Sequence, residues 1–207
     1  MKFILGKKQN MIQYFTDEGS AIPATLISAG PIIITAIKEK EKDGYTAVQA
    51  GYGEKKENRL SKAVKGHLKD LGNLRNLKEF RLSPEEILAY KKGDKIDASV
   101  FSKGDVVEVA STSKSKGFQG VVKRHGFAGG SRTHGQKHSE REPGSIGGGA
   151  RAGGRVAKGI RMAGRMGGDR ITVKNLKIIE VDQTNNQIVV SGAIPGRRGT
   201  LVEIRGK

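Results

Sequence analysis

The feature that most constrains this chain is a glycine-rich, strongly basic segment that runs from Gly117 to Gly168. Its 52 residues contain 16 of the chain's 30 glycines, and ten lysines and arginines against two acids, Glu140 and Glu142. The segment therefore carries a net charge of +8, and the other 155 residues share the remaining +9 of the total of +17. Glycine loses the most backbone entropy on folding and like charges repel, so this composition limits what the segment can form alone.

The segment lacks the apolar side chains that it would need to fold around a core of its own. Ordering one residue of backbone costs about 1–2 kcal/mol at room temperature, and glycine costs the most. The apolar residues between 117 and 168 are few and scattered, so their burial offsets only part of that cost. Either the segment stays disordered, or a large polyanion orders it. The second interpretation fits the composition better, because glycine allows a close approach to phosphates and arginine binds phosphate or stacks on bases.

The composition of the whole chain also indicates a polyanionic partner. The 207 residues have a net charge of +17 and a pI of about 10.1, which favours nucleic acid first and an anionic membrane surface second. The chain has no cysteine, which excludes disulfides and thiolate metal sites. No apolar run approaches the roughly 20 residues of a membrane span, and the apolar start of MKFILGKKQN is too short for a signal peptide. We therefore expect a cytoplasmic protein without a membrane partner.

Outside the basic segment, the chain shows the patterns of a mainly β protein. Apolar or alternating runs recur about every ten residues between turn signals, which is typical of a barrel or a sandwich. Gly6, Lys7 and Lys8 are expected to end the first strand, and a hairpin turn is expected at 184–186. The expected strands are 3–5, 11–15, 21–27, 32–37, 45–51, 95–101, 106–110, 170–173, 176–181, 187–190 and 201–204.

Residues 55–92 interrupt the β pattern and predict a small α-containing insert. Ser61 is a candidate N-cap for a helix over 62–71, which a glycine would end. Ser83, followed by a proline and two glutamates, predicts a second, short helix through Tyr90. The basic segment lies between two groups of strands, so it leaves one β domain and returns to it.

We therefore expect three parts. Residues 1–111 form a β-barrel body that includes the insert at about 55–92. Residues 112–168 form an extended loop, and residues 169–207 supply the strands that complete the barrel.

Three of the four histidines lie in the basic segment, and two of them have a spacing that suits a metal site on a helix. His134 and His138 are four residues apart and Glu140 is near, which leaves open a histidine-dependent RNA-processing enzyme such as a nuclease. Gly135 and its glycine-rich surroundings argue against a helix, and no third ligand stands at a standard spacing. The glycines of 144–149 lack the G-x-x-x-x-G-K-[ST] pattern of a nucleotide loop. We expect no catalytic residue, metal, cofactor or small-molecule substrate.

Seven further stretches stand out along the chain. The longest is TSKSKGFQGVVKR at 112–124, and the others are 6–15, 43–45, 133–135, 143–147, 162–167 and 192–196. In order and along nearly the whole chain, they resemble the bacterial large-subunit ribosomal protein L3 family. There are two departures: the stretch 148–155 has neither the glutamine nor the proline that many bacterial members carry, so methylation of that glutamine is not expected, and His125 stands where many members have tryptophan.

The resemblance implies a translation-type β-barrel with a small α/β insert, and a long glycine/arginine-rich extended loop that penetrates the rRNA toward the peptidyl transferase centre. It also implies a structural role without catalysis: direct binding of 23S rRNA near its 3′ end, help in nucleating 50S assembly, and contacts with neighbouring large-subunit ribosomal proteins. For Lys7 and Lys8, solvated surface charge explains the residues about as well as RNA contact. The residues that we expect to bind rRNA are Lys7, Lys8, Lys116, Lys123, Arg124, His125, Arg132, His134, Arg141, Ser145, Arg151, Arg155, Lys158, Arg161 and Arg165.

Overall fold

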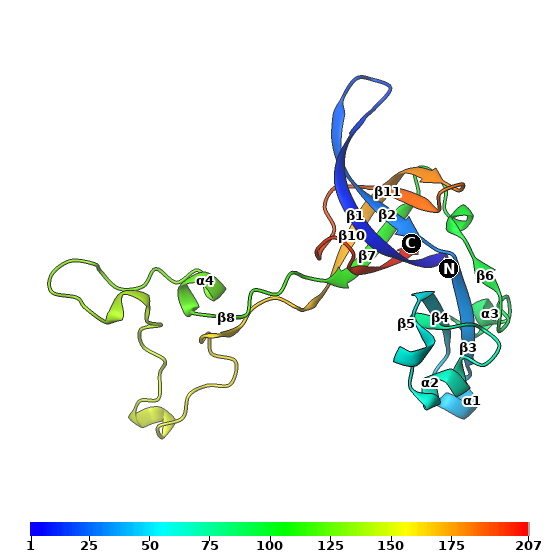
Figure 1. Cartoon of the computed structure of the whole chain (residues 1–207). Coiled ribbons are helices and arrows are strands. Elements are labelled where there is room, and N and C mark those ends of the chain that lie inside the picture. The colour runs from blue at the N-terminus through cyan, green and yellow to red at the C-terminus, as the bar shows by residue number, and fades with distance from the viewer. Residues whose placement is uncertain (207) are drawn as a thin grey trace. The chain divides into compact units, whose positions relative to one another are not determined.

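The computed structural model describes residues 1–206, which divide into two compact units. The first unit, which we call the body, consists of Met1–Thr112 and the chain from Arg170 onward. The second unit, which we call the extension, is Ser113–Asp169. In Figure 1 the extension is the green-to-yellow part of the chain that comes after β7 and before β10.

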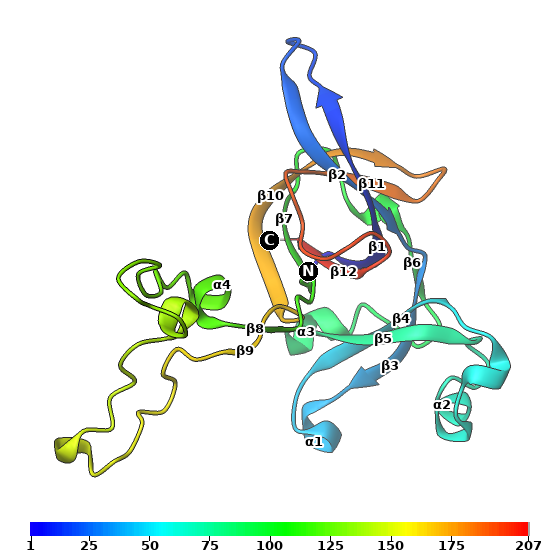
Figure 2. The same cartoon turned by 60° about the vertical axis from the view of Figure 1, so that its left-hand side comes forward.

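A closed, six-stranded barrel forms the larger part of the body. All neighbouring strands are antiparallel, and β2 pairs with both β1 and β11, which closes the ring (Figure 2). Closure leaves this sheet without an unpaired edge. The prediction of a mainly β fold built on a barrel is therefore confirmed. In their order around the ring the strands are β1 (Phe3–Phe15), β12 (Leu201–Gly206), β7 (Val106–Thr112), β10 (Arg170–Asp182), β11 (Gln187–Ser191) and β2 (Ala21–Ala29).

A second, four-stranded antiparallel sheet completes the body. β3 and β4 belong to this sheet rather than to the barrel, so the part of the body outside the barrel begins earlier than the insert expected at about 55–92. Residues 74–81, expected to lie in an α-containing stretch, form β5, one of its two edge strands. The apolar, β-branched run of β3 and the alternating pattern at 45–51 each predict a strand, but neither says which sheet the strand joins. In sheet order the strands are β5 (Leu74–Arg81), β4 (Ala47–Glu54), β3 (Ile32–Lys38) and β6 (Lys95–Ile96).

One core joins the barrel and the second sheet. The first residues of β1, Phe3 to Leu5, are 0–1% exposed because both faces of the strand are covered. Phe3 stacks on Phe80 of β5, with ring centroids 4.3 Å apart. Strands buried on both faces have continuous rather than alternating apolar sequences, which explains the Phe-Ile-Leu run.

The helices of the body are short. Ser61 and Ser83 cap α2 and α3 as predicted, since each hydroxyl accepts a hydrogen bond from the backbone N–H three residues later. Ser83 and Glu86 complete a capping box. Both helices end earlier than predicted, and no helix within residues 1–206 is long and apolar enough to span a membrane. The α-helices are α1 (Lys40–Asp43), α2 (Lys62–His67) and α3 (Pro84–Ile87), and the 3₁₀ turns are η1 (Glu57–Arg59) and η2 (Ala98–Val100).

Two breaks predicted between strands are wrong, because both positions are β-bulges within one longer strand. The pairing of β1 with β2 shifts register between Lys8 and Met11, and that of β10 with β7 shifts between Val173 and Leu176. Gly6 does not end the first strand either. A Cβ on Gly6 would lie only 2.6 Å from the carbonyl oxygen of Ser28, so this glycine permits β1 and β2 to approach closely. The strand predicted over 95–101 stops at Ile96, after which η2 begins at Ala98.

Candidate nucleic-acid interface

The extension begins and ends in a short antiparallel stem. The backbone N–H of Ser113 donates to the carbonyl of Asp169 at 2.9 Å, and that of Lys116 donates to the carbonyl of Met166 at 2.9 Å. Beyond these bonds, β8 (Phe118–Gln119) pairs with β9 (Gly164–Arg165). In the stem, the two arms therefore supply hydrogen-bond partners for each other's backbone N–H and C=O groups.

A short helix, α4 (Val121–His125), comes directly after the stem. Two of its side chains, Arg124 and His125, contact the returning arm at Met162, and we call this contact the clamp. The Arg124 guanidinium donates to the carbonyl oxygen of Met162 at 2.7 Å, and Nε2 of His125 lies 3.0 Å from the same oxygen. A Cβ on Gly164 would lie 2.6 Å from the Arg124 guanidinium, so the glycine makes room for it. Two residues expected to bind rRNA thus have a contact within the extension.

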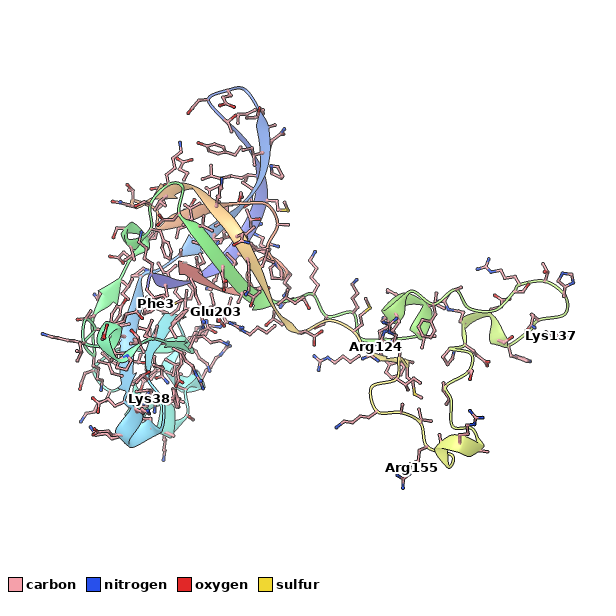
Figure 3. All side chains as sticks on the ribbon, turned by 180° about the vertical axis from the view of Figure 1, so that it is seen from behind. Phe3, Lys38, Arg124, Lys137, Arg155 and Glu203 are labelled. Atoms are coloured by element: carbon pink, nitrogen blue, oxygen red, sulfur yellow. The ribbon has the colours of Figure 1, made fainter. Side chains whose placement is uncertain are left out.

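Beyond the clamp, residues 127–144 form a loop that closes on itself. The N–H of Gly130 donates to the carbonyl of Glu140 at 3.1 Å, and the Glu140 carboxylate lies 3.5 Å from Arg132. Gly129 has φ +76°, and a Cβ there would lie 2.0 Å from the carbonyl oxygen of Glu140. Only glycine therefore allows the two sides of this loop to meet without displacing the backbone. Figure 3 shows Lys137 on this loop and Arg155 on the next one.

The second loop, about residues 145–161, contains only short-range hydrogen bonds. Its backbone bonds join residues three apart, as in η4 (Ala150–Ala152), where the N–H of Ala152 donates to the carbonyl of Gly149 at 2.9 Å. Residues 149–161 are all exposed. Nothing within the extension covers this loop.

The extension has almost no core. Val121, at 2% exposure, is the only buried residue between 113 and 169. A 57-residue unit with one buried side chain cannot offset its conformational entropy by apolar burial. The contacts described above for the stem, the clamp and the first loop are hydrogen bonds and one ion pair, which agrees with the scarcity of apolar residues in the sequence.

All the cations of the extension except the half-buried Arg124 are exposed, and most are unneutralised. Residues 113–169 contain twelve lysines and arginines against three acids, a net charge of +9. Within this range the one ion pair is that of Arg132 with Glu140, and the Arg132 side chain is 84% exposed. Lys114 and Lys137, which the sequence did not single out, are also exposed. The exposed members of the expected set are Lys116, Lys123, Arg132, His134, Arg141, Ser145, Arg151, Arg155, Lys158, Arg161 and Arg165.

Lys7 and Lys8 belong to the body and lie apart in sequence from the other expected contacts. The Lys8 ammonium donates to the carbonyl oxygens of Ile194 at 2.6 Å and Gly196 at 3.0 Å, so it holds the loop before β12. Lys7 is half-buried, with its ammonium 6.0 Å from the Tyr52 ring centroid. Lys8 thus has a structural contact that its position in a basic pair does not predict.

The histidine cluster considered as a metal site does not lie on a helix. His134 has φ +60° in a turn, and η3 (Ser139–Arg141) begins only after His138. Among residues 1–206, no group of three or more histidine, aspartate or glutamate side chains is placed to hold a metal ion.

The body and the extension together define a class of protein: a basic β-barrel that carries a long cationic segment without a core. Within that class, the sequence profile of the family described as ribosomal protein L3 matches residues 85–192. A protein of Herpetosiphon aurantiacus named large ribosomal subunit protein uL3 is 47% identical over 202 residues, which cover 97% of this chain and 94% of the relative. Proteins of the same name from Chlorobium phaeobacteroides (48% over 205 residues; 99% of this chain and 98% of the relative) and Finegoldia magna (44% over 207 residues; 99% and 97%) are similar. The chain belongs to the ribosomal protein L3 family.

Proposed function

We propose that this chain is a structural constituent of the large ribosomal subunit, in the cytoplasm, and that it is not an enzyme. It binds 23S rRNA directly near the 3′ end of that RNA and helps to nucleate subunit assembly beside neighbouring ribosomal proteins. Residues 1–111 and 169–207 form the anchoring barrel body, and residues 112–168 form a loop that enters the RNA toward the peptidyl transferase centre.

The observation that carries this proposal is the composition of the extension. It has one buried side chain, a net charge of +9 and exposed guanidinium groups along both loops. A polyanion supplies what this unit lacks, because phosphates neutralise the cations and bases offer surfaces on which guanidinium planes can stack. Family membership and the names of the relatives agree with this interpretation.

The salt dependence of RNA binding tests the proposal. Each neutralised phosphate adds about 0.7–0.9 to the slope of log K against log salt concentration. We expect steep salt dependence for binding to a transcript of the 3′-terminal part of 23S rRNA. Replacing Arg151, Arg155 and Lys158 together by glutamine is expected to lower the slope by about 2–3, because three cations of the second loop are lost.

The matched control removes the same charge from the surface of the body. Lys62, Lys69 and Lys92 are exposed and have no ion pair in the described part of the chain, so their replacement by glutamine changes the net charge equally. The control variant should keep most of the slope. A flat salt dependence of the unmodified protein, or equal losses in both variants, would contradict binding through the extension.

A further inference from the structure

The body has an open cleft between β5, an edge strand of the second sheet, and the barrel. Its volume is about 500 Å³, many times the roughly 30 Å³ that one water molecule occupies in the liquid. Strands β4 and β5 provide one wall, and β10 and β12 provide the other. The residues that line it are Gln49, Leu77, Lys78, Glu79, Arg81, Arg170, Glu203 and Arg205.

Glu203 joins the two walls of the cleft. The residue is 7% exposed, and one carboxylate oxygen is paired with Arg170 of β10 while the other lies 3.2 Å from the ammonium of Lys78 of β5. Figure 3 shows Glu203 near the junction of the barrel with the second sheet. Because Glu203 is engaged by two cations, it does not neutralise the other arginines of the cleft.

Arg205 is the cleft residue with a buried polar atom that has no hydrogen-bond partner among the described residues. Its guanidinium carbon lies 5.2 Å from the centroid of the Phe80 ring, which restricts the orientation of the group. Its Nε is buried and has no hydrogen-bond partner among the described residues. A buried donor without a partner is costly, so the fold holds Arg205 at the cleft at some cost in stability.

Arg81 is a second cation without an ion pair in the described structure. Its guanidinium lies 5.1 Å from the Tyr45 ring centroid. The acid beside it, Glu79, accepts hydrogen bonds from the Tyr45 hydroxyl at 2.7 Å and the Gln49 amide at 3.2 Å. The cleft thus holds four cations against two acids, a net charge of +2.

We propose that this cleft is a second RNA-binding site, in which Arg205 and Arg81 bind a backbone phosphate. The inference rests on the proposed function and assigns the body a contact separate from the extension. Both guanidinium groups line the cleft, and guanidinium suits phosphate because it presents several donors in a plane. Contact with Phe80 and Tyr45 orients both groups before the RNA binds.

The experiment compares single variants for binding to the same 23S rRNA transcript. Arg205→Gln and Arg81→Gln should each lower the salt slope by about 0.7–0.9 and weaken binding about tenfold. Arg205→Lys should keep the slope, because it keeps the charge, but should recover only part of the affinity. Arg75→Gln is the matched control, since Arg75 is exposed on β5, the strand of Arg81, and does not line the cleft. This variant should leave the salt slope and the affinity unchanged.

The outcomes separate this inference from the proposed function. Unchanged binding by both Arg205→Gln and Arg81→Gln, while the triple glutamine variant of the extension loses slope, would overturn the cleft and leave the proposed function intact. That result would also be expected if an acidic protein segment occupied the cleft. An equal loss in Arg75→Gln would overturn the site by showing that only total charge matters. Arg81→Gln decides the question if Arg205→Gln does not fold, because the exposed Arg81 can be replaced without opening the core.

Discussion

Replacing Glu203 by glutamine should destabilise the body, because this carboxylate links the barrel to the second sheet. The substitution keeps the shape of the side chain and removes its charge, so both partners lose a charge-assisted contact. Hydrogen bonds to charged groups contribute about 1.5–3 kcal/mol each when both partners are held. Arg170 and Lys78 are 50% and 43% exposed and regain water, so we expect a total loss of about 1.5–2 kcal/mol.

The measurement is urea unfolding of the full chain followed by circular dichroism, with thermal unfolding as a second measurement. For 150–250 residues, a loss of 1 kcal/mol lowers Tm by about 2–4 °C, so Glu203→Gln should lower Tm by about 3–8 °C. Glu108→Gln is the control, since Glu108 is 35% exposed and lies 3.8 Å from Lys174, which is 67% exposed. That open pair should contribute about 0–1 kcal/mol.

A double-mutant cycle shows whether the loss comes from the pair. Arg170→Met alone leaves Glu203 buried with only Lys78, whereas the double variant removes both charges. We expect a coupling of about 1 kcal/mol or more between Glu203 and Arg170. Equal stability of Glu203→Gln and Glu108→Gln, or a coupling near zero, would refute the idea that the ion pair of Glu203 with Arg170 stabilises the body.

The same contact should be visible in the pH dependence of stability. Burial raises the pKa of Glu203, but the hydrogen bond from Arg170 and the positive charge of Lys78 together hold it below its ordinary value. A carboxyl whose pKa is lowered on folding stabilises the protein fully above its unfolded pKa, about 4.3, and loses this contribution as the pH falls through the folded pKa. The difference in unfolding free energy between wild type and Glu203→Gln should therefore shrink below about pH 4. A difference that grows on acidification would contradict the assigned direction.

Two further predictions concern the extension. Arg124→Met removes the hydrogen bond to the Met162 carbonyl and should speed amide exchange over residues 160–166 about tenfold or more, without changing the stability of the body. The control is Arg161→Met, at an exposed position, which should leave these exchange rates unchanged. Equal protection in both variants would disprove the clamp. Deleting 127–161 should leave the unfolding free energy of the body within about 1 kcal/mol of wild type, because the deleted stretch contains no buried residue, and loss of the cooperative transition would show that it belongs to the core.

The sequence predicted the body where local chemistry decides the structure. Ser61 and Ser83 are caps because a hydroxyl before a helix satisfies backbone donors that no other local group reaches. The sequence does not predict which sheet a strand joins, since the apolar run of β3 and the alternation at 45–51 would suit a barrel strand equally well. The sequence does not predict the edge strand β5, because LRNLKEFR contains no β-branched residue and five of its eight residues are charged or polar.

For the extension, composition predicted the absence of a core but could not divide its cations by role. Arg124 and His125 contact Met162 within the chain, and Lys8 holds the carbonyls of the loop before β12. An arginine that binds a carbonyl and one that binds a phosphate look alike in a sequence, because both offer planar donors to an oxygen. Arg205 was overlooked for a related reason: only the fold places it over Phe80 with a buried N–H.

The stem and the clamp bear on how tightly the extension can bind RNA. Every residue that RNA must order subtracts about 1–2 kcal/mol from the binding free energy. The contacts of 113–126 with 162–169 fix both arms before binding, and the bonds that close the first loop, 127–144, fix part of that loop as well. The cost of ordering then falls chiefly on the second loop, 145–161, which has only local bonds and exposed cations. Substitutions that open the clamp should therefore weaken RNA binding even when they remove no phosphate contact, because they enlarge the part of the chain that RNA has to order.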